Sequence, residues 1–355
     1  MLKFIYPFDF STQNSGQSIG NLELDEPLPY SQDTPGSGFY RPGHIQLDNG
    51  LRLDLILYHN EATSAFMYTH TRPVDPRLLD LVGLPHDVLA GRQEWTLPGQ
   101  LTLGSDRSKL IGLAIQNMFS SPSMQRAFTG QHQNHIAVFP IAREGLKYQV
   151  TEAIYENYGY YCDEVILDAH HVFDSSVPVY NRKVEMTLFK DKDLDKIQHE
   201  NITVAFIADS IASGLVMREV IAKVKERFPR IQRVEVIAPF ATIRGLCRIA
   251  EEDGQNGTRI RVHSFETLLN ALPPDYYYSA HYGIPQFHIC PELEEKYRAW
   301  WGQDRNGNFI ADTACAGYGW SEVFFSPHKQ IEMINGELTE RHNLTIADII
   351  RRNLA

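Results

Sequence analysis

The chain has 355 residues, of which 43% are hydrophobic, and a formal net charge of −11 at pH 7. This length allows one large domain or two smaller ones, and the apolar content is sufficient for a packed core. Because the charge is negative and no lysine- or arginine-rich run occurs, we expect neither nucleic acid nor a membrane as a partner.

The cysteines and the N-terminus suggest the compartment. The four cysteines, Cys162, Cys247, Cys290 and Cys315, are widely spaced and match no zinc-binding pattern. Reduced thiols in a cytoplasmic protein are therefore expected. The first residues lack the apolar core and cleavage site of a signal peptide, and no stretch approaches the length of a membrane span.

Residues 1–103 are interpreted as a β-rich N-terminal addition. Residues 8–43 are rich in Ser, Gln, Gly, Pro and Asp, which predicts an extended arm or surface loop. Such an arm could contact a second copy, so a homodimer is possible. The turn Asp48-Asn49-Gly50 predicts a β-hairpin over His44 to Tyr58. Ser64 to Thr71 suggests another strand, and Asp75 to Ala90 suggests one or two short helices.

Residues 104–355 alternate apolar runs with amphipathic stretches, a pattern typical of βα units. A helix is expected over Ser105 to Phe119. The predicted strands are His135–Ile141, Asp163–Asp168, Ile202–Ala208, Arg233–Pro239 and Arg259–Phe265. The predicted fold class is therefore α/β, with a mostly parallel twisted sheet flanked by helices. Ligands of such sheets bind at the carboxyl ends of the strands.

Three further segments of residues 104–355 carry weaker signals. Ala169 to Pro178 is expected to be irregular, and Asn335-Gly336 predicts a hairpin before a terminal helix near Thr345. The histidine pairs in this part of the chain have no carboxylate or cysteine at a recognised spacing, so no metal ligands are predicted. These pairs are His132 with His135 and His170 with His171.

The most informative stretch runs from Asn201 to Phe228. The apolar run Ile202 to Ala208 predicts a strand buried on both faces, and Asp209 to Gly214 is a turn of small and polar residues. From Leu215 the apolar residues recur with a helical period until Pro229 ends the helix. A strand, a small-residue turn and a helix in this order present free backbone N–H groups to a phosphate.

This stretch resembles the signature of the type I phosphoribosyltransferases, which is an apolar strand, one or two acids, small residues, Thr-Gly and a helix. Asp209, Ser213 and Gly214 match the signature. The resemblance implies that Asp209 is catalytic and holds the ribose hydroxyls of 5-phosphoribosyl pyrophosphate (PRPP), and that the loop holds the 5′-phosphate. The implied loop residues are Ser210, Ile211, Ala212, Ser213, Gly214 and Leu215.

Two positions of the stretch depart from the signature. Ala208 stands where most members carry a first acid, although the uracil branch of the family also keeps only one acid. Leu215 and Val216 replace a small residue and a hydroxyl, which removes a phosphate contact. The alternative interpretation is an ordinary turn between a strand and a helix.

A second segment resembles the uracil phosphoribosyltransferases. Pro140, Ile141, Arg143 and Gly145 match a segment that runs Pro-Ile, one apolar residue, Arg, a small residue and Gly. In that family the arginine lies on the pyrophosphate, where its planar fork suits two oxygens. The resemblance implies that Arg143 is catalytic. A surface ion pair with Glu144 is the alternative.

Two more regions receive roles from the resemblance. Arg182 and Lys183 stand where the family has a loop that closes over PRPP; a solvated strand edge is the alternative. Residues of about 273–330 are aromatic and contain glycine, and they resemble loosely the family's loop that reads the base. The implied acceptor-binding residues are Asp312, Ala316, Gly317, Tyr318 and Trp320. A glycine turn supporting aromatic packing explains them equally well.

The resemblance implies an enzyme that transfers a phosphoribosyl group from PRPP, carried with Mg²⁺, to a base-like or other small acceptor, with release of pyrophosphate. Two alternatives stay open. One is a non-catalytic protein of the same fold that binds nucleotide or PRPP as a regulator. The other is a different α/β enzyme acting on a phosphorylated metabolite.

Overall fold

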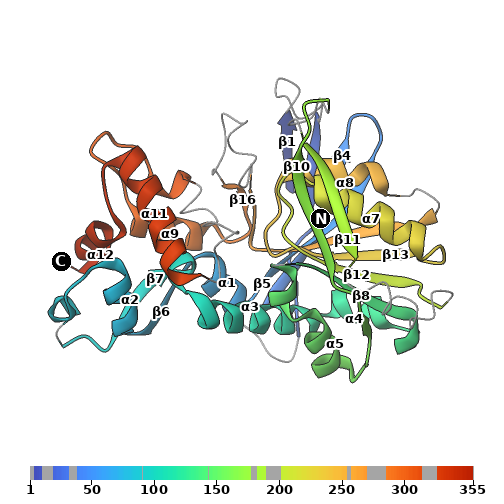
Figure 1. Cartoon of the computed structure of the whole chain (residues 1–355), viewed down its shortest axis with the longest axis horizontal. Helices are drawn as coiled ribbons and strands as arrows, with labels where there is room; N and C mark the ends of the chain where they lie inside the picture. Colours follow the sequence, from blue (N-terminus) through green and yellow to red (C-terminus); the bar gives the residue numbers. More distant parts are fainter. Residues whose placement is uncertain are drawn as a thin grey trace.

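A sheet of twelve strands forms the centre of the molecule (Figure 1). The structure is a computed structural model, and it describes residues 4–9, 19–31, 38–89, 91–142, 144–176, 182–188, 201–253, 257–269, 285–313 and 326–354. No helix in these ranges combines the length and the apolar character of a membrane span.

Parallel strands make up the middle of this sheet. In order across the sheet they are β5 (Arg52–His59), β14 (Arg259–Phe265), β13 (Arg233–Ile237), β12 (Val204–Ala208) and β8 (Ile136–Ala142). All five residues of β12 are buried, and they alternate between two cores. Val204 and Phe206 belong to the core on one face, Ala205 and Ile207 to the core on the other. The mostly parallel α/β fold is thereby confirmed.

Antiparallel strands from the N-terminus extend the same sheet beyond β5. They are β1 (Phe4–Asp9), β2 (Ile19–Leu24), β3 (Leu28–Pro29) and β4 (Phe39–Leu47). The predicted hairpin is confirmed as β4 and β5. The prediction of an arm over residues 8–43 is wrong for β2 and the start of β4. Leu22 and Leu24 are fully buried, so the alternation of buried and more exposed side chains in β2 determines its structure despite the polar composition of the segment.

A strand pair completes the opposite edge of the sheet. Beyond β8 lie β9 (Asp163–Glu164), β10 (Leu167–Phe173) and β11 (Arg182–Leu188). The prediction of an irregular segment from Ala169 is wrong as far as Phe173. These residues belong to β10, which pairs with β11 along its whole length.

Helices cover both faces of the sheet (Figure 1). On one face lie α7 (Leu215–Arg227) and α8 (Ile243–Ile249), followed by η5 (Ala250–Glu252). On the other lie α1 (Glu61–Met67), α3 (Gly104–Phe119), α4 (Pro122–Phe128), η4 (Gly145–Tyr148) and α5 (Val150–Tyr158), with η3 (Gln133–His135) before β8. The strand predicted over Ser64 to Thr71 is wrong as far as Met67 and confirmed for Thr69 to Thr71, which begin β6 (Thr69–Pro73). Asn60 caps α1 and accepts hydrogen bonds from the amides of Ala62 and Thr63.

A second lobe joins residues 69–103 to the C-terminal part of the chain, with the C-terminus at its outer side (Figure 1). Its N-terminal elements are β6 (Thr69–Pro73), α2 (Pro76–Val82), η1 (His86–Leu89), β7 (Glu94–Pro98) and η2 (Gly99–Leu101). Its C-terminal elements are α9 (Pro291–Trp301), η8 (Ile310–Asp312), α11 (Pro327–His342) and α12 (Ile346–Leu354). The small strand pair β15 (Thr267–Leu269) and β16 (Pro285–His288) leads into it.

The predicted hairpin at Asn335-Gly336 is wrong, because both residues lie inside α11. Ile331, Ile334 and Leu338 of this helix are buried at helical spacing, and their burial outweighs the local turn signal. The terminal helix expected near Thr345 is confirmed as α12.

Candidate functional site

The chain leaves β8 and β12 toward opposite faces of the sheet. After β8, η4 and α5 pack with α3 on one face; after β12, α7 packs on the other face. These strands are neighbours and parallel, so their carboxyl ends meet at one edge. Such a divergence opens the crevice in which α/β proteins hold ligands.

The loops at this crevice approach each other closely. A Cβ atom on Gly145 would lie 1.9 Å from the carbonyl oxygen of Ala208, so only glycine fits there. The segment that begins with Glu144 is thereby pressed against the end of β12, directly beside Asp209. The structure thus brings together the two loops that the sequence singled out.

A hydrogen-bonded cluster of three side chains joins the loops. The Tyr148 hydroxyl lies 2.7 Å from Oε1 of Glu144 and 2.8 Å from Oγ of Ser210. Ser210 Oγ also donates to Glu144 Oε1, at 2.9 Å. Sequence reasoning missed Glu144 and Tyr148 as parts of the site, because only the pairing of β8 with β12 places them beside Ser210.

Asp209 is half-buried at the end of β12. Burial raises the pKa of its carboxyl well above the ordinary value, and the negative charge of Glu144 raises it further. The backbone amide of Ser210 acts in the opposite sense, because it donates a hydrogen bond to the carboxylate. Two acids side by side are unfavourable alone, but they suit a ligand that brings hydroxyl groups or a cation.

The predicted phosphate loop is folded tightly onto α8. Gly214 has φ of +77°, and a Cβ atom there would lie 2.6 Å from the carbonyl oxygen of Gly245. Ser213 is buried, with 1% of its surface exposed, and the Leu215 amide donates to its hydroxyl at 3.3 Å.

Two loop amides are already paired. The Ile211 amide donates to the Phe240 carbonyl at 2.9 Å and the Leu215 amide to the Ser213 hydroxyl, so the expectation that these two amides bind phosphate is corrected. The described hydrogen bonds do not use the amides of Ala212, Ser213 and Gly214. These three amides, at the N-terminus of α7, are the part of the loop that could face a phosphate.

A buried cationic side chain contacts this loop. Arg248 of α8 donates to the Ser213 carbonyl. Burial, together with the positive charges of Arg182 and Arg248, lowers the pKa of His171 to about 4. Sequence reasoning found Arg182 but missed Arg248, because an arginine inside a helix gives no local signal of its contacts.

The neighbouring Lys183 is placed differently. Adjacent residues of a strand point to opposite faces, so Lys183 faces away from Arg182. It forms an ion pair with Glu185 at 3.1 Å, and both side chains are about half exposed. Lys183 therefore fits the alternative of a solvated strand edge.

Four of the five predicted acceptor-binding residues lie outside the described residues, as does Arg143. These four are Ala316, Gly317, Tyr318 and Trp320. Asp312 is described, and it forms a bidentate ion pair with Arg298 of α9 in the second lobe. The contacts of the described residues do not join it to Asp209.

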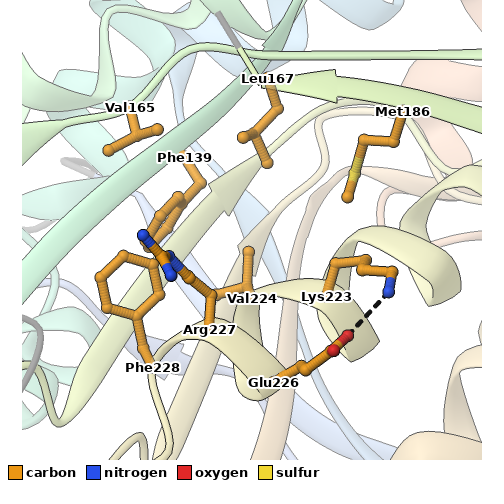
Figure 2. Close-up of a pocket in the computed structure, with 9 residues that line it drawn as sticks. All are labelled: Phe139, Val165, Leu167, Met186, Lys223, Val224, Glu226, Arg227 and Phe228. Atoms are coloured by element: carbon orange, nitrogen blue, oxygen red, sulfur yellow. Dashed lines mark hydrogen bonds and ion pairs between the residues drawn. The ribbon is translucent and has the colours of Figure 1, made fainter. Parts of the chain in front are cut away.

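A separate apolar cavity of about 290 Å³ lies between the strand pair β10–β11 and α7 (Figure 2). Phe139, Leu167 and Met186 line it, and an ion pair between Lys223 and Glu226 (2.7 Å) stands at its wall. The cavity contains neither Asp209 nor the loop that follows it, so it is not the crevice described above.

Comparison with known proteins gives only a distant likeness. No family model and no curated protein matches the sequence. Among solved structures, the chain is similar to adenine phosphoribosyltransferase from Trypanosoma brucei, determined in complex with AMP, pyrophosphate and ribose-5-phosphate. The identity is 9% and the TM-score 0.34, and the match covers 68% of this chain and 95% of that one. An activity therefore has to be inferred from the residues of the site.

Proposed function

We propose that the chain binds PRPP in the crevice between β8 and β12 and transfers the phosphoribosyl group to a small acceptor, releasing pyrophosphate. One observation carries this proposal: the two loops whose sequences predict PRPP contacts meet there, with Gly145 against the Ala208 carbonyl. Their meeting depends on strand order, which neither local motif specifies.

Each group has a role that fits its position. The Asp209 carboxylate accepts hydrogen bonds from the ribose hydroxyls and lies near the positive charge that develops on the ribose ring. The amides of Ala212, Ser213 and Gly214 receive the 5′-phosphate at the start of α7. Arg248 adds positive charge beside this loop, and Arg182 acts together with it on His171. Catalysis of this kind is positioning combined with electrostatic stabilisation.

The acidic pair fits a magnesium ion that arrives with PRPP. Mg²⁺ prefers one or two carboxylates together with substrate oxygens and water. Burial is the main cause of the raised pKa of Asp209, and repulsion from Glu144 adds to it; a divalent cation would relieve this repulsion. Glu144 and Asp209 would hold the ion, and its chemistry would be to neutralise charge on the pyrophosphate.

Calorimetric titration with PRPP and Mg²⁺ tests the proposal. Asp209→Ala is expected to weaken binding by about 100-fold or more, since it removes the group that orients the ribose. Asp80→Ala is the matched control, because Asp80 is exposed in the second lobe. A screen of small acceptors for pyrophosphate release then tests transfer. Equal affinity of the natural protein and Asp209→Ala would contradict the assignment.

The pairing of the Ile211 amide favours a second candidate, a non-catalytic protein that binds PRPP or nucleotide. With this amide paired and Ser213 buried, fewer groups are left to hold a phosphate during transfer. Tight nucleotide binding that is lost in Asp209→Ala, without pyrophosphate release for any acceptor, would select this candidate.

A further inference from the structure

Three potential metal ligands meet near the carboxyl ends of β5 and β14. His59 is the last residue of β5, Glu266 follows β14, and Cys290 precedes α9. Nδ1 of His59 lies 3.0 Å from Oε2 of Glu266 and 3.3 Å from Sγ of Cys290. One ligand atom from each residue lies within 4.8 Å of the other two. Among the described residues, this is the one such group of three.

The spacing matches that of ligands around a tetrahedral zinc ion. With bonds of about 2.3 Å to sulfur and about 2.0–2.1 Å to nitrogen and oxygen, sulfur and nitrogen lie about 3.6 Å apart, and nitrogen and oxygen about 3.3 Å apart. The observed distances of 3.3 and 3.0 Å are shorter by only a few tenths of an ångström. Small side-chain rotations would open the space for an ion.

Glu266 is held rigidly in its position. Its side chain is fully buried, and its backbone has φ of +44°, a conformation that costs energy for a residue other than glycine. Its other carboxylate oxygen, Oε1, lies 2.5 Å from Oγ1 of Thr63. Thr63 is itself fixed through the cap of α1, where the Asn60 amide donates to the same hydroxyl. Partners of this kind orient ligands in metal sites.

The arrangement does not suit a cysteine nucleophile. A Cys–His–Glu relay would use both ring nitrogens of the histidine, whereas Cys290 and Glu266 both contact Nδ1 of His59. Cys290 is also buried, with 3% of its surface exposed, which opposes an exposed reactive thiolate. A bound divalent cation, by contrast, stabilises a coordinated thiolate.

We propose that Nδ1 of His59, a carboxylate oxygen of Glu266 and Sγ of Cys290 bind one Zn²⁺ ion, with solvent as the fourth ligand. Imidazole and thiolate favour zinc over Mg²⁺ or Ca²⁺, which prefer oxygen alone. The His59 side chain is 23% exposed and offers a path to solvent. The site is distinct from the proposed PRPP crevice: β14 lies two strands from β12, a lateral distance of about 10 Å.

Sequence analysis predicted no metal ligands, and the reason is the separation of these three residues along the chain. His59 is 207 residues from Glu266 and 231 from Cys290. Local spacing patterns cannot reveal such a site, because the parallel pairing of β5 with β14 creates it.

Metal titration of the tag-free, chelator-treated full chain tests this inference. The natural protein is expected to bind one Zn²⁺, measured by competition with a chromogenic chelator. Cys290→Ala is expected to weaken binding by about 100-fold or more, and Thr63→Val by about 10-fold through loss of the supporting contact. Cys247→Ala is the matched control, because Cys247 is equally buried, on α8, and outside the cluster.

Cobalt substitution gives a readout that does not depend on affinity. Co²⁺ bound to the natural protein and to Cys247→Ala should show a thiolate charge-transfer band, which Cys290→Ala and Glu266→Gln should weaken or lose. Circular dichroism and retained PRPP binding identify variants that have stayed folded. Equal zinc affinity in all folded variants, no binding by the natural protein, or a cobalt spectrum without the thiolate band would overturn the inference.

Discussion

Two carboxylates at the same edge of the sheet have opposite surroundings. Asp209 follows β12 beside a second acid, Glu144, and Glu266 follows β14 beside a base and a thiol. Burial raises the pKa of both carboxyls, but hydrogen bonds from His59 and Thr63 lower that of Glu266 in compensation. The first arrangement suits a ligand that brings its own cation, and the second suits a metal ion held by the protein. If both proposals hold, one architecture supports two kinds of recognition, and the neighbouring residues decide between them.

The largest expected effect comes from separating the two loops of the first site. Gly145→Ala places a Cβ atom against the Ala208 carbonyl and should lower the free energy of unfolding by about 3 kcal/mol or more, together with loss of PRPP binding. Denaturant titration measures the change.

Gly336 supplies a matched control, because it lies inside α11 with open space around it. Gly336→Ala should stabilise the protein by about 0.5–1 kcal/mol through helix propensity. If both alanine variants had the same stability, the close contact of the loops would be refuted.

A smaller and pH-dependent effect is expected from Asp209→Asn. The pKa of Asp209 is raised in the folded state, so the folded protein holds this proton at pH values where the unfolded chain has lost it. The stability of the natural protein therefore falls as pH rises from about 4 through the raised pKa. Asp209→Asn carries no ionisable group at this position, so its stability does not fall in this way. At pH 7 the variant should be more stable than the natural protein by on the order of 1 kcal/mol, while binding PRPP poorly.

Thermal unfolding between pH 4 and 8 measures this difference. The advantage of Asp209→Asn should shrink toward pH 4, where the natural carboxyl begins to bind its proton in the unfolded chain as well. A constant difference across this range would show that burial and Glu144 do not control Asp209.

The smallest expected effect is that of Glu144→Gln. Glutamine keeps an acceptor for Tyr148 and Ser210 but removes the negative charge that raises the pKa of Asp209. The pH at which PRPP affinity declines on the acid side should therefore move downward. Calorimetry at several pH values measures the midpoint of this decline. An unchanged midpoint would show that the charge of Glu144 does not influence Asp209 in PRPP binding.

The correctly predicted elements are those in which the apolar pattern of the element's own sequence predicts which side chains are buried. β12 is an apolar run between turn signals, β13 and β14 alternate apolar with polar residues, and α7 carries a helical apolar period. Errors arose where a local signal competed with packing. The cap at Asn60 starts a helix in a segment taken for a strand, and the Asn335-Gly336 pair lies within a buried helix.

The candidate sites were predictable only in part. Asp209 and its loop follow from a local motif, whereas Glu144 and Tyr148 join the site through the pairing of β8 with β12. Arg248 reaches Ser213 through the packing of α8, and His59 reaches Glu266 through β5 and β14. Contacts between distant segments depend on strand order, which the sequence of a single segment does not contain.

The position of β5 has a consequence for how the chain is made. Its hairpin with β4 closes over a short turn, but its other neighbour, β14, is synthesised much later: 205 residues separate Tyr58 from His263, to which it is hydrogen-bonded. Until β14 arrives, the nascent hairpin has one open edge and the uncovered side chains of Leu53, Leu55 and Leu57. Completion of the sheet is therefore a late, long-range event, during which the emerging polypeptide is vulnerable to aggregation and depends on protection of that edge.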